Sequence, residues 1–270
     1  MLILLADEDP AVHAHIRTRL EAGGDAVFQF LERQRLHPDP AVRRRVLELL
    51  NHRAAERYDN QFLAFILSHG EQFDLEEALW AFTRTRFPEI NVAAFRAQLD
   101  AWAGRVRERL LVSATGEETL LALNHVLFEE LGFRGAEEDY FNPLNSYVNC
   151  VMDSRRGIPI SLSAIYMCVA RRLGLPVAGI GMPGHFLCRY QTPREEFYID
   201  AFHGGRLLSR ADCKRRIAQL AVEYDDSQLA PVSHRRLMQR MIANLHLIYK
   251  ERKQRAEAER LQRYLVALSR

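Results

Sequence analysis

Cysteine is scarce in this sequence, and none of it falls in the pairs that zinc-binding modules use. The four cysteines are Cys150, Cys168, Cys188 and Cys213, separated by 18, 20 and 25 residues, and no CxxC occurs. Structural zinc sites usually take two ligands from one such pair, so this spacing fits no zinc pattern. We therefore expect free, mostly buried thiols in a reducing compartment.

Long apolar runs are lacking as well. The opening MLILLADEDP contains an apolar run too short for a signal peptide, and no basic residues precede it. No stretch of the chain approaches the roughly 20 apolar residues that span a bilayer. We expect a cytoplasmic protein without a membrane partner.

The sequence also lacks an excess of either charge. Its 37 basic and 35 acidic residues leave a formal net charge of +2. Such a balance gives no long-range field for nucleic acid, and no helix-turn-helix with a basic recognition face stands out, so we predict no nucleic-acid partner. We expect the recurring arginine pairs to lie on solvated helix faces: Arg155–Arg156, Arg171–Arg172, Arg215–Arg216 and Arg235–Arg236.

Apolar residues, in contrast, are plentiful, and in the N-terminal part they recur with helical spacing. Hydrophobic residues make up 48% of the chain, which is enough for a substantial core. Asp9–Val12 recurs as Asp39–Val42, and each copy places an acidic N-cap before a proline at the first helical position. This repeat predicts a HEAT-like helical segment over residues 1–70. Two ordinary helices that share a good start sequence would give the same pattern.

Further helices are predicted up to Gly132 and again after Ser209. Their starts are marked by capping residues, with capping boxes at Asp74–Glu77 and Thr115–Glu118. The predicted helices span residues 60–69, 75–87, 92–106, 116–132, 145–156 and 210–220. After Ser233 the helical pattern runs to the C-terminus, and a hairpin that breaks near Lys253 is predicted.

Strand patterns occur only between these helical regions. The predicted strands are Val177–Ile180, His185–Tyr190, Phe197–Asp200 and Leu207–Leu208, with Gly204–Gly205 in the last turn. The chain is therefore predicted to be α+β, with helices at both ends and a small antiparallel sheet between them. The predicted domains are residues 1–70, a core over 71–225, and a C-terminal helical pair over 226–270.

Within this core, the segment Gly157–Gly205 contains two thirds of a Cys-His-Asp centre. His185 opens one predicted strand and Asp200 closes another, and both face the start of the helix that precedes them. In such a centre the thiol sits at a helix N-terminus, where the helix dipole and an imidazolium lower its pKa, while the acid orients the ring. Pro159 stands at that helix start.

Three motifs carry a resemblance to a known family: DYFNPLNSY at 139–147, RRGIPISL at 155–162 and MPGHF at 182–186. Together with the LGLP of Leu173–Pro176, they resemble the SirB-type subgroup of the transglutaminase-like superfamily. The LGLP register places Pro159 where that superfamily carries its cysteine, and His185 and Asp200 where it carries its histidine and aspartate.

This resemblance implies a papain/transglutaminase-like core that lacks the usual catalytic cysteine, followed by tetratricopeptide-like helices. Members of the subgroup are mostly of unknown function; one bacterial member is linked by name to invasion-gene regulation, and eukaryotic relatives carry an F-box. The candidate binding residues are Asn142, Asn145, Pro159 and His203.

Four neighbouring side chains are the candidates to replace the missing thiol. Cys168 lies nine residues beyond Pro159, on the opposite helix face and roughly 13 Å along the axis, and Cys188 points to the other face of its strand from His185. Ser161 and Ser163 remain as candidate nucleophiles, although capping or helix–sheet packing would explain them equally.

Two functions follow from these observations. The first is a catalytically degenerate transglutaminase-like module that binds a protein partner. The alternative is a Ser-His-Asp hydrolase or acyltransferase that acts on an amide or ester through His185 and Asp200 with Ser161 or Ser163. His203 could join His185 and Asp200 around a metal, but a fourth ligand is not evident, so we predict no metal and no cofactor.

Overall fold

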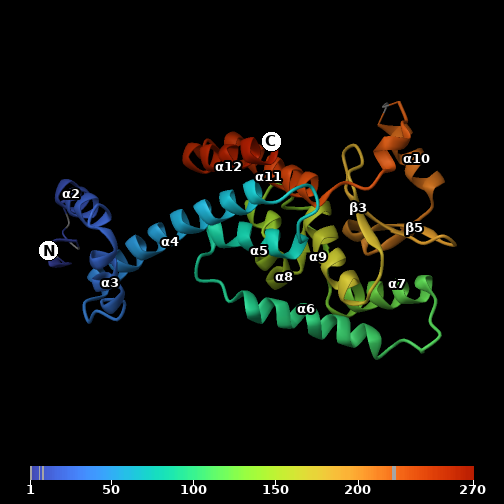
Figure 1. The fold of residues 1–270 in the computed structure, drawn as a ribbon, viewed down its shortest axis with the longest axis horizontal. Helices are drawn as coiled ribbons and strands as arrows, with labels where there is room; N and C mark the ends of the chain where they lie inside the picture. The colour runs from blue at the N-terminus through green and yellow to red at the C-terminus, as the bar shows by residue number, and fades with distance from the viewer. Residues whose placement is uncertain (1, 6, 8, 221–222) are drawn as a thin grey trace. The chain divides into compact units, whose positions relative to one another are not determined.

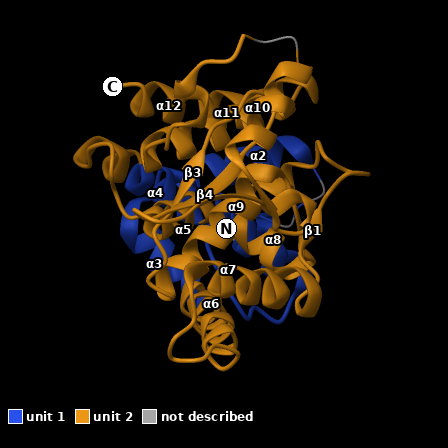
Figure 2. Cartoon of the chain, turned by 90° about the vertical axis from the view of Figure 1, so that its right-hand side faces the viewer, with its two compact units in different colours: residues 1–62, 84–90 blue, residues 63–83, 91–270 orange. Residues whose placement is uncertain are grey.

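The computed structural model describes residues 2–5, 7, 9–220 and 223–270, and its path is drawn in Figure 1. The chain forms two compact units, one of residues 1–62 and 84–90, the other of residues 63–83 and 91–270 (Figure 2). Within the described ranges, no helix combines the length and apolarity that a bilayer crossing requires. The predicted domain limits at residues 70 and 225 stay predictions.

Unit 1 is helical and has its own apolar core. It contains α1 (Leu2–Leu5), α2 (Pro10–Glu21), α3 (Gly24–Arg33) and most of α4 (Pro40–Ser68). Both predicted acid-proline starts are present: Asp9 accepts a hydrogen bond from the Ala11 N–H at 2.8 Å, and Asp39 accepts one from Ala41 at 2.7 Å. The apolar residues of these helices, among them Leu20, Leu31 and Val46, form one buried cluster.

The separate helix predicted over residues 60–69 is wrong. α4 runs without interruption from Pro40 to Ser68, because no glycine or proline occurs between those positions to end it. A HEAT-like repeat for this region remains a prediction.

The helices that lead into the sheet begin where the capping residues predict. Asn91 caps α6 (Val92–Arg107), and Thr115 with Glu118 forms the predicted capping box of α7 (Gly116–Asn124). Asp74 accepts from the Glu77 N–H at 2.9 Å at the start of α5 (Leu75–Arg86). The chain continues from α7 as the π-helical turn η1 (His125–Glu130).

The sheet of unit 2 is antiparallel and follows the chain order. Its strands are β3 (Val177–Ile180), β4 (Leu187–Gln191), β5 (Glu196–Asp200) and β6 (Arg206–Leu208). The buried helix α9 (Pro159–Arg172) contacts β3, β4 and the short turn η3 (Ala201–His203). His185 precedes β4 instead of opening it, because Gly184 has a φ of +66° and the His185 N–H bonds back to the Met182 carbonyl at 3.2 Å.

A second, smaller ladder lies outside the predicted strands. β1 (Arg134–Gly135) pairs in parallel with β2 (Arg156–Gly157), and between them the chain forms η2 (Pro143–Ser146) and α8 (Val148–Ser154). The single helix predicted over 145–156 is therefore wrong, because Tyr147 has an extended backbone and Arg155 has a φ of 60°. Two-residue strands have no periodicity that a sequence pattern could show.

The C-terminal part is a helical hairpin that follows α10 (Arg210–Gln219) and η4 (Asp226–Leu229). α11 (His234–Glu251) and α12 (Arg255–Leu268) pack together and are separated at Arg252–Gln254, where Lys253 has a φ of 58°. Arg235 is buried and donates to the Ile66 carbonyl at 3.0 Å and the Ala267 carbonyl at 2.6 Å, near the ends of α4 and α12. The predicted α+β class and the break near Lys253 are both confirmed.

Candidate functional site

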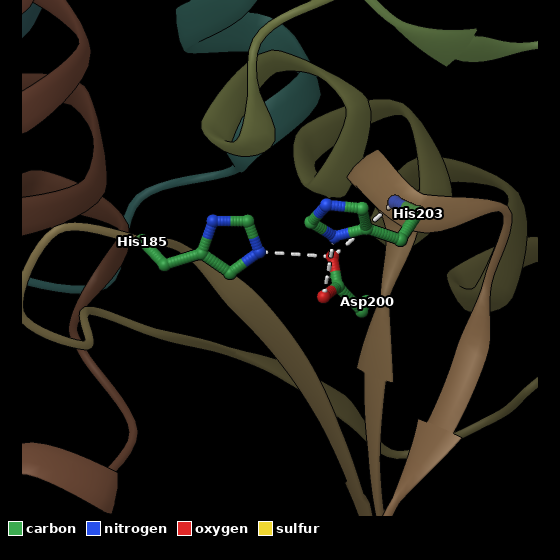
Figure 3. A group of neighbouring side chains, drawn as sticks. All are labelled: His185, Asp200 and His203. Atoms are coloured by element: carbon green, nitrogen blue, oxygen red, sulfur yellow. Dashed lines mark hydrogen bonds and ion pairs between the residues drawn. The ribbon is translucent and has the colours of Figure 1, made fainter. Parts of the chain in front are cut away.

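One fully buried carboxylate, Asp200, gathers three basic side chains at the end of β5. Its Oδ1 lies 2.9 Å from His185 Nε2, and its Oδ2 lies 2.8 Å from His203 Nδ1 and 2.5 Å from an Arg216 guanidinium nitrogen. Figure 3 shows the two imidazoles converging on the carboxylate from the β4 side and from η3. The carboxylate thus joins a loop, a strand end, a turn and α10.

The local sequence around Asp200 makes this convergence possible. The Asp200 carbonyl accepts the Gly205 N–H at 2.9 Å, and the Asp200 carboxylate also accepts the His203 N–H at 3.4 Å. Gly204 and Gly205 have φ values of +70° and +73°, which residues with a Cβ rarely adopt. The paired glycines therefore fold η3 back over the end of its own strand and bring His203 to Asp200.

The electrostatics of Asp200 favour its ionised form. Burial by itself raises the pKa of this carboxyl, but the hydrogen bonds and charges of His185, Arg216 and His203 outweigh burial and hold the pKa far below its usual range. An ionised carboxylate only accepts hydrogen bonds, so His185 Nε2 and His203 Nδ1 carry protons. In its neutral form His185 then has its lone pair on Nδ1, the nitrogen that a nucleophile would approach.

The loop that carries His185 is fixed from the C-terminal hairpin. A guanidinium nitrogen of Arg240, on α11, donates to the Met182 carbonyl at 3.0 Å and to the His185 carbonyl at 2.8 Å. The same guanidinium lies 5.6 Å from the ring centre of Phe186. One arginine thus holds both ends of the turn that orients the imidazole.

The start of α9 presents no described hydroxyl to His185. Pro159 is the first residue of the helix, and the Ser161 Oγ accepts from the Ile158 N–H and donates to the Ile158 carbonyl, both at 3.1 Å. Ser163 is fully buried, and its Oγ has no hydrogen-bond partner in the part of the chain that the structure describes. Ser161 therefore caps the helix, and Ser163 lies inside the core.

The neighbouring thiols are buried and poorly ionised. Burial raises the pKa values of Cys168 and Cys188 to about 12. The Cys188 thiol donates to the Ser163 carbonyl at 3.5 Å. Because the thiolate is the reactive form, neither cysteine is poised to act as a nucleophile at neutral pH.

Asn142 and Asn145 stabilise the turn before α8. Asn142 accepts from the Leu144 N–H at 3.0 Å and donates to the Asp139 carboxylate at 2.7 Å, and Asn145 donates to the Asp139 carbonyl at 2.6 Å. Both asparagines line a hollow of about 360 Å³ together with Cys150. Their assignment as binding residues stays a prediction.

His185, Asp200 and His203 could together contact one metal ion, since one ligand atom from each lies within 4.8 Å of the others. Imidazole nitrogen and carboxylate oxygen are suitable zinc ligands. The Arg216 guanidinium already occupies Oδ2 of the carboxylate, and its charge opposes that of a cation. The predicted absence of a metal stays a prediction.

The arginine pairs that we expected on solvated faces do not all lie there. The Arg216 side chain is 28% exposed and binds Asp200, the Arg172 side chain is 15% exposed and binds Glu76, and Arg235 is buried. Arg155 lies over the Trp102 ring, 4.9 Å from its centre. The expectation was wrong because in an adjacent pair the two side chains leave the helix about 100° apart, so one can point inward.

Comparison with known proteins assigns a family to this architecture. A family model described as the transglutaminase-like superfamily matches residues 93–243. This range contains the whole site: the start of α9, His185, Asp200, His203, Arg216 and Arg240.

Curated relatives from bacteria and animals each match part of the chain. A UPF0162 protein of Xylella fastidiosa strain 9a5c is 33% identical over 172 residues, which are 62% of this chain and 61% of that protein. UPF0162 protein PA3419 of Pseudomonas aeruginosa is 28% identical over 64% of each chain. F-box only protein 21 of Mus musculus is 38% identical over 136 residues, which are 47% of this chain and 21% of that protein.

The chain thus spans about three fifths of the length of these bacterial relatives. No solved structure matches it.

Proposed function

This chain belongs to the transglutaminase-like superfamily, and from that premise we propose that it is a catalytically degenerate member that acts as a protein-binding, regulatory module. The observation that carries the proposal is the start of α9, where Pro159 is the first residue and the Ser161 hydroxyl is bound to the Ile158 backbone. The LGLP register assigns the nucleophile position to this proline. A His–Asp pair without a hydroxyl or thiolate beside it cannot form an acyl intermediate.

The contacts of Asp200 support a structural role for the retained pair. The carboxylate receives hydrogen bonds from His185, His203 and Arg216, which come from three different segments. A buried carboxylate with this many donors holds those segments together even when no substrate is present. His185 is then retained as part of a rigid scaffold.

The relatives support a role as a module of larger assemblies. In the mouse protein, which is named for an F-box, the matched region makes up 21% of the chain. A related region inside a much longer protein is compatible with a recruitment or regulatory module. We further assign the chain to the SirB-type subgroup, with α11 and α12 as a tetratricopeptide-like pair.

The four free cysteines support the proposed cytoplasmic location. Three of them are buried, and a reducing compartment keeps such thiols unpaired.

One observation favours the alternative, a Ser-His-Asp hydrolase or acyltransferase. His185 points Nε2 at Asp200 and keeps Nδ1 without a partner among the described residues, which is the orientation that a general base needs. For this alternative, the α9 N-terminus would have to rearrange so that Ser161 or Ser163 reached that nitrogen.

A serine-directed fluorophosphonate separates the two functions. The proposal predicts that the wild-type protein stays unlabelled under conditions that label a serine hydrolase of known activity. Labelling that disappears in both H185Q and the S161A/S163A double variant would establish the alternative. An S269A variant serves as the matched control, because Ser269 lies exposed after α12 and bonds only to the Val266 carbonyl and the Leu265 carbonyl.

A further inference from the structure

A groove on the hairpin side of the His185 loop has an apolar floor and a cationic rim. It has a volume of about 620 Å³ and lies within unit 2. Phe186, Val232, Ala243 and Leu265 supply its apolar lining, and Arg236 and Arg240 supply the charge. An apolar surface beside fixed charge is typical of sites that receive a peptide segment.

The two guanidiniums of this groove are not neutralised by the protein. Over the described ranges of the chain, neither the exposed Arg236 nor the half-buried Arg240 has a carboxylate within ion-pair distance, whereas several half-buried arginines of unit 2 pair with Asp or Glu. Glu71, near the start of α11, is bound to the Ser233 hydroxyl at 2.5 Å. The groove therefore carries uncompensated positive charge in a chain whose net charge is only +2.

The position of Arg236 adds to this charge. It lies in the first turn of α11, a turn that holds no acidic residue. The N-terminus of a helix already has partial positive charge, so a cation there is unfavourable unless an anion binds nearby. Natural sequences usually retain an unfavourable charge of this kind where it serves a function.

Arg240 can bind such an anion without leaving its own contacts. One of its terminal nitrogens donates to the two loop carbonyls, whereas the other lies toward Gly181, where a Cβ would come within 3.2 Å of it. The absence of a side chain at Gly181 thus leaves this nitrogen open to the groove.

We propose that this groove binds a segment of a partner protein that carries an acidic side chain next to an aliphatic one. The carboxylate binds Arg236 and Arg240, and the aliphatic side chain packs on Leu265, Ala243 and Val232. Because Arg240 also donates to the backbone of the His185 loop, the bound partner lies next to the segment that carries His185. The inference rests on the proposed protein-binding function and specifies the chemistry of the partner.

The test is an NMR titration of the full chain with the tetrapeptide acetyl-Glu-Leu-Glu-Leu-amide, read at the arginine Nε and the Leu265 and Val232 methyl resonances. We expect saturable shifts at these resonances and at least fivefold weaker binding for acetyl-Gln-Leu-Gln-Leu-amide. The variant R236E should weaken binding of the acidic peptide at least fivefold. R194E is the charge-matched control and should leave it unchanged, because Arg194 lies exposed in the β4–β5 turn.

Three outcomes would overturn the inference: no saturable shift at millimolar acidic peptide, equal binding of the glutamine peptide, or equal effects of R236E and R194E. The failure of the proposed function has a different signature. His185-dependent fluorophosphonate labelling contradicts the non-catalytic role whatever the peptide does, whereas absent peptide binding in an unlabelled protein contradicts the groove alone.

Discussion

Two buried carboxylates of unit 2, Glu76 and Asp200, are each surrounded by three basic side chains, but the kinds of base differ. Glu76 at the start of α5 lies within ion-pair distance of Arg96, Arg171 and Arg172, all of which keep their charge at any pH at which the protein is folded. Asp200 has one arginine and two histidines, and imidazole is the side chain whose charge ordinarily changes near neutral pH.

This difference separates the Glu76 cluster, whose charges are permanent, from the Asp200 cluster, whose histidines can exchange protons. The Glu76 cluster joins α5 to the end of α9, and no member of it ordinarily gains or loses a proton near neutral pH. The Asp200 cluster joins titratable groups beside η3, which contacts α9. On the proposed function, the fold keeps the proton-binding part of the centre although the nucleophile is missing.

The largest effect on the free energy of unfolding is expected from breaking the Glu76 cluster. E76Q removes the charge that Arg172 faces, and the Arg172 side chain is only 15% exposed, so its cation is left largely buried. We expect a loss of about 3 kcal/mol in the free energy of unfolding, measured by urea denaturation at pH 7. D200N should cost less, about 2 kcal/mol, because its two histidines can become neutral. A larger loss for D200N than for E76Q would contradict the comparison.

The second prediction concerns the pH dependence of the Asp200 contribution. The pKa of this carboxyl is lowered in the folded state, so its stabilising effect is complete above the ordinary aspartate pKa of about 4 and decreases as the pH falls below that value. The stability difference between wild type and D200N should therefore be larger at pH 5 than at pH 3. Urea denaturation at both pH values measures this stability difference. A difference that increases toward low pH would contradict the prediction.

The smallest effect separates the two histidines. The His185 side chain is 14% exposed and the His203 side chain is 47% exposed, so water can replace the second contact more easily than the first. We expect H185Q to lower the free energy of unfolding by about 1 kcal/mol and H203Q by less than about 0.5 kcal/mol. Thermal unfolding of the two variants side by side tests whether H185Q is the less stable. Equal losses of stability would show that the exposure of each histidine does not determine how much its contact stabilises the protein.

Sequence patterns predicted the class of fold and the pairing of His185 with Asp200, but not how this pair is held. Motif order placed His185, Asp200 and Pro159 in one core, and capping residues located the starts of several helices, because such signals lie within a few residues of each other. The inward arginines, Arg216 and Arg240, were missed as parts of the centre. Their partners lie 16 and 55 residues away in the chain, and no local pattern records such a pairing.

The errors in the predicted elements have two origins. A separate helix was predicted from Asn60 although no glycine or proline before that residue ends α4, so the sequence itself already argued against the division. The β1–β2 ladder depends on two segments more than twenty residues apart, with only two residues in each strand. This ladder is decided by tertiary packing, which a single sequence does not display.

The central claim, that this centre lacks only its nucleophile, is tested most directly by P159C. The introduced thiol would lie at the first position of α9, where the helix dipole lowers its pKa. On the proposed function, His185 lowers that pKa further. Iodoacetamide labelling at pH 6, followed by mass spectrometry of the intact site, compares it with the half-buried Cys150 in the same molecule. The account predicts labelling at least tenfold faster than at Cys150, and a loss of that advantage in P159C/H185Q. The account would be contradicted if the introduced thiol were labelled no faster than Cys150, or if its labelling rate were the same in P159C and P159C/H185Q.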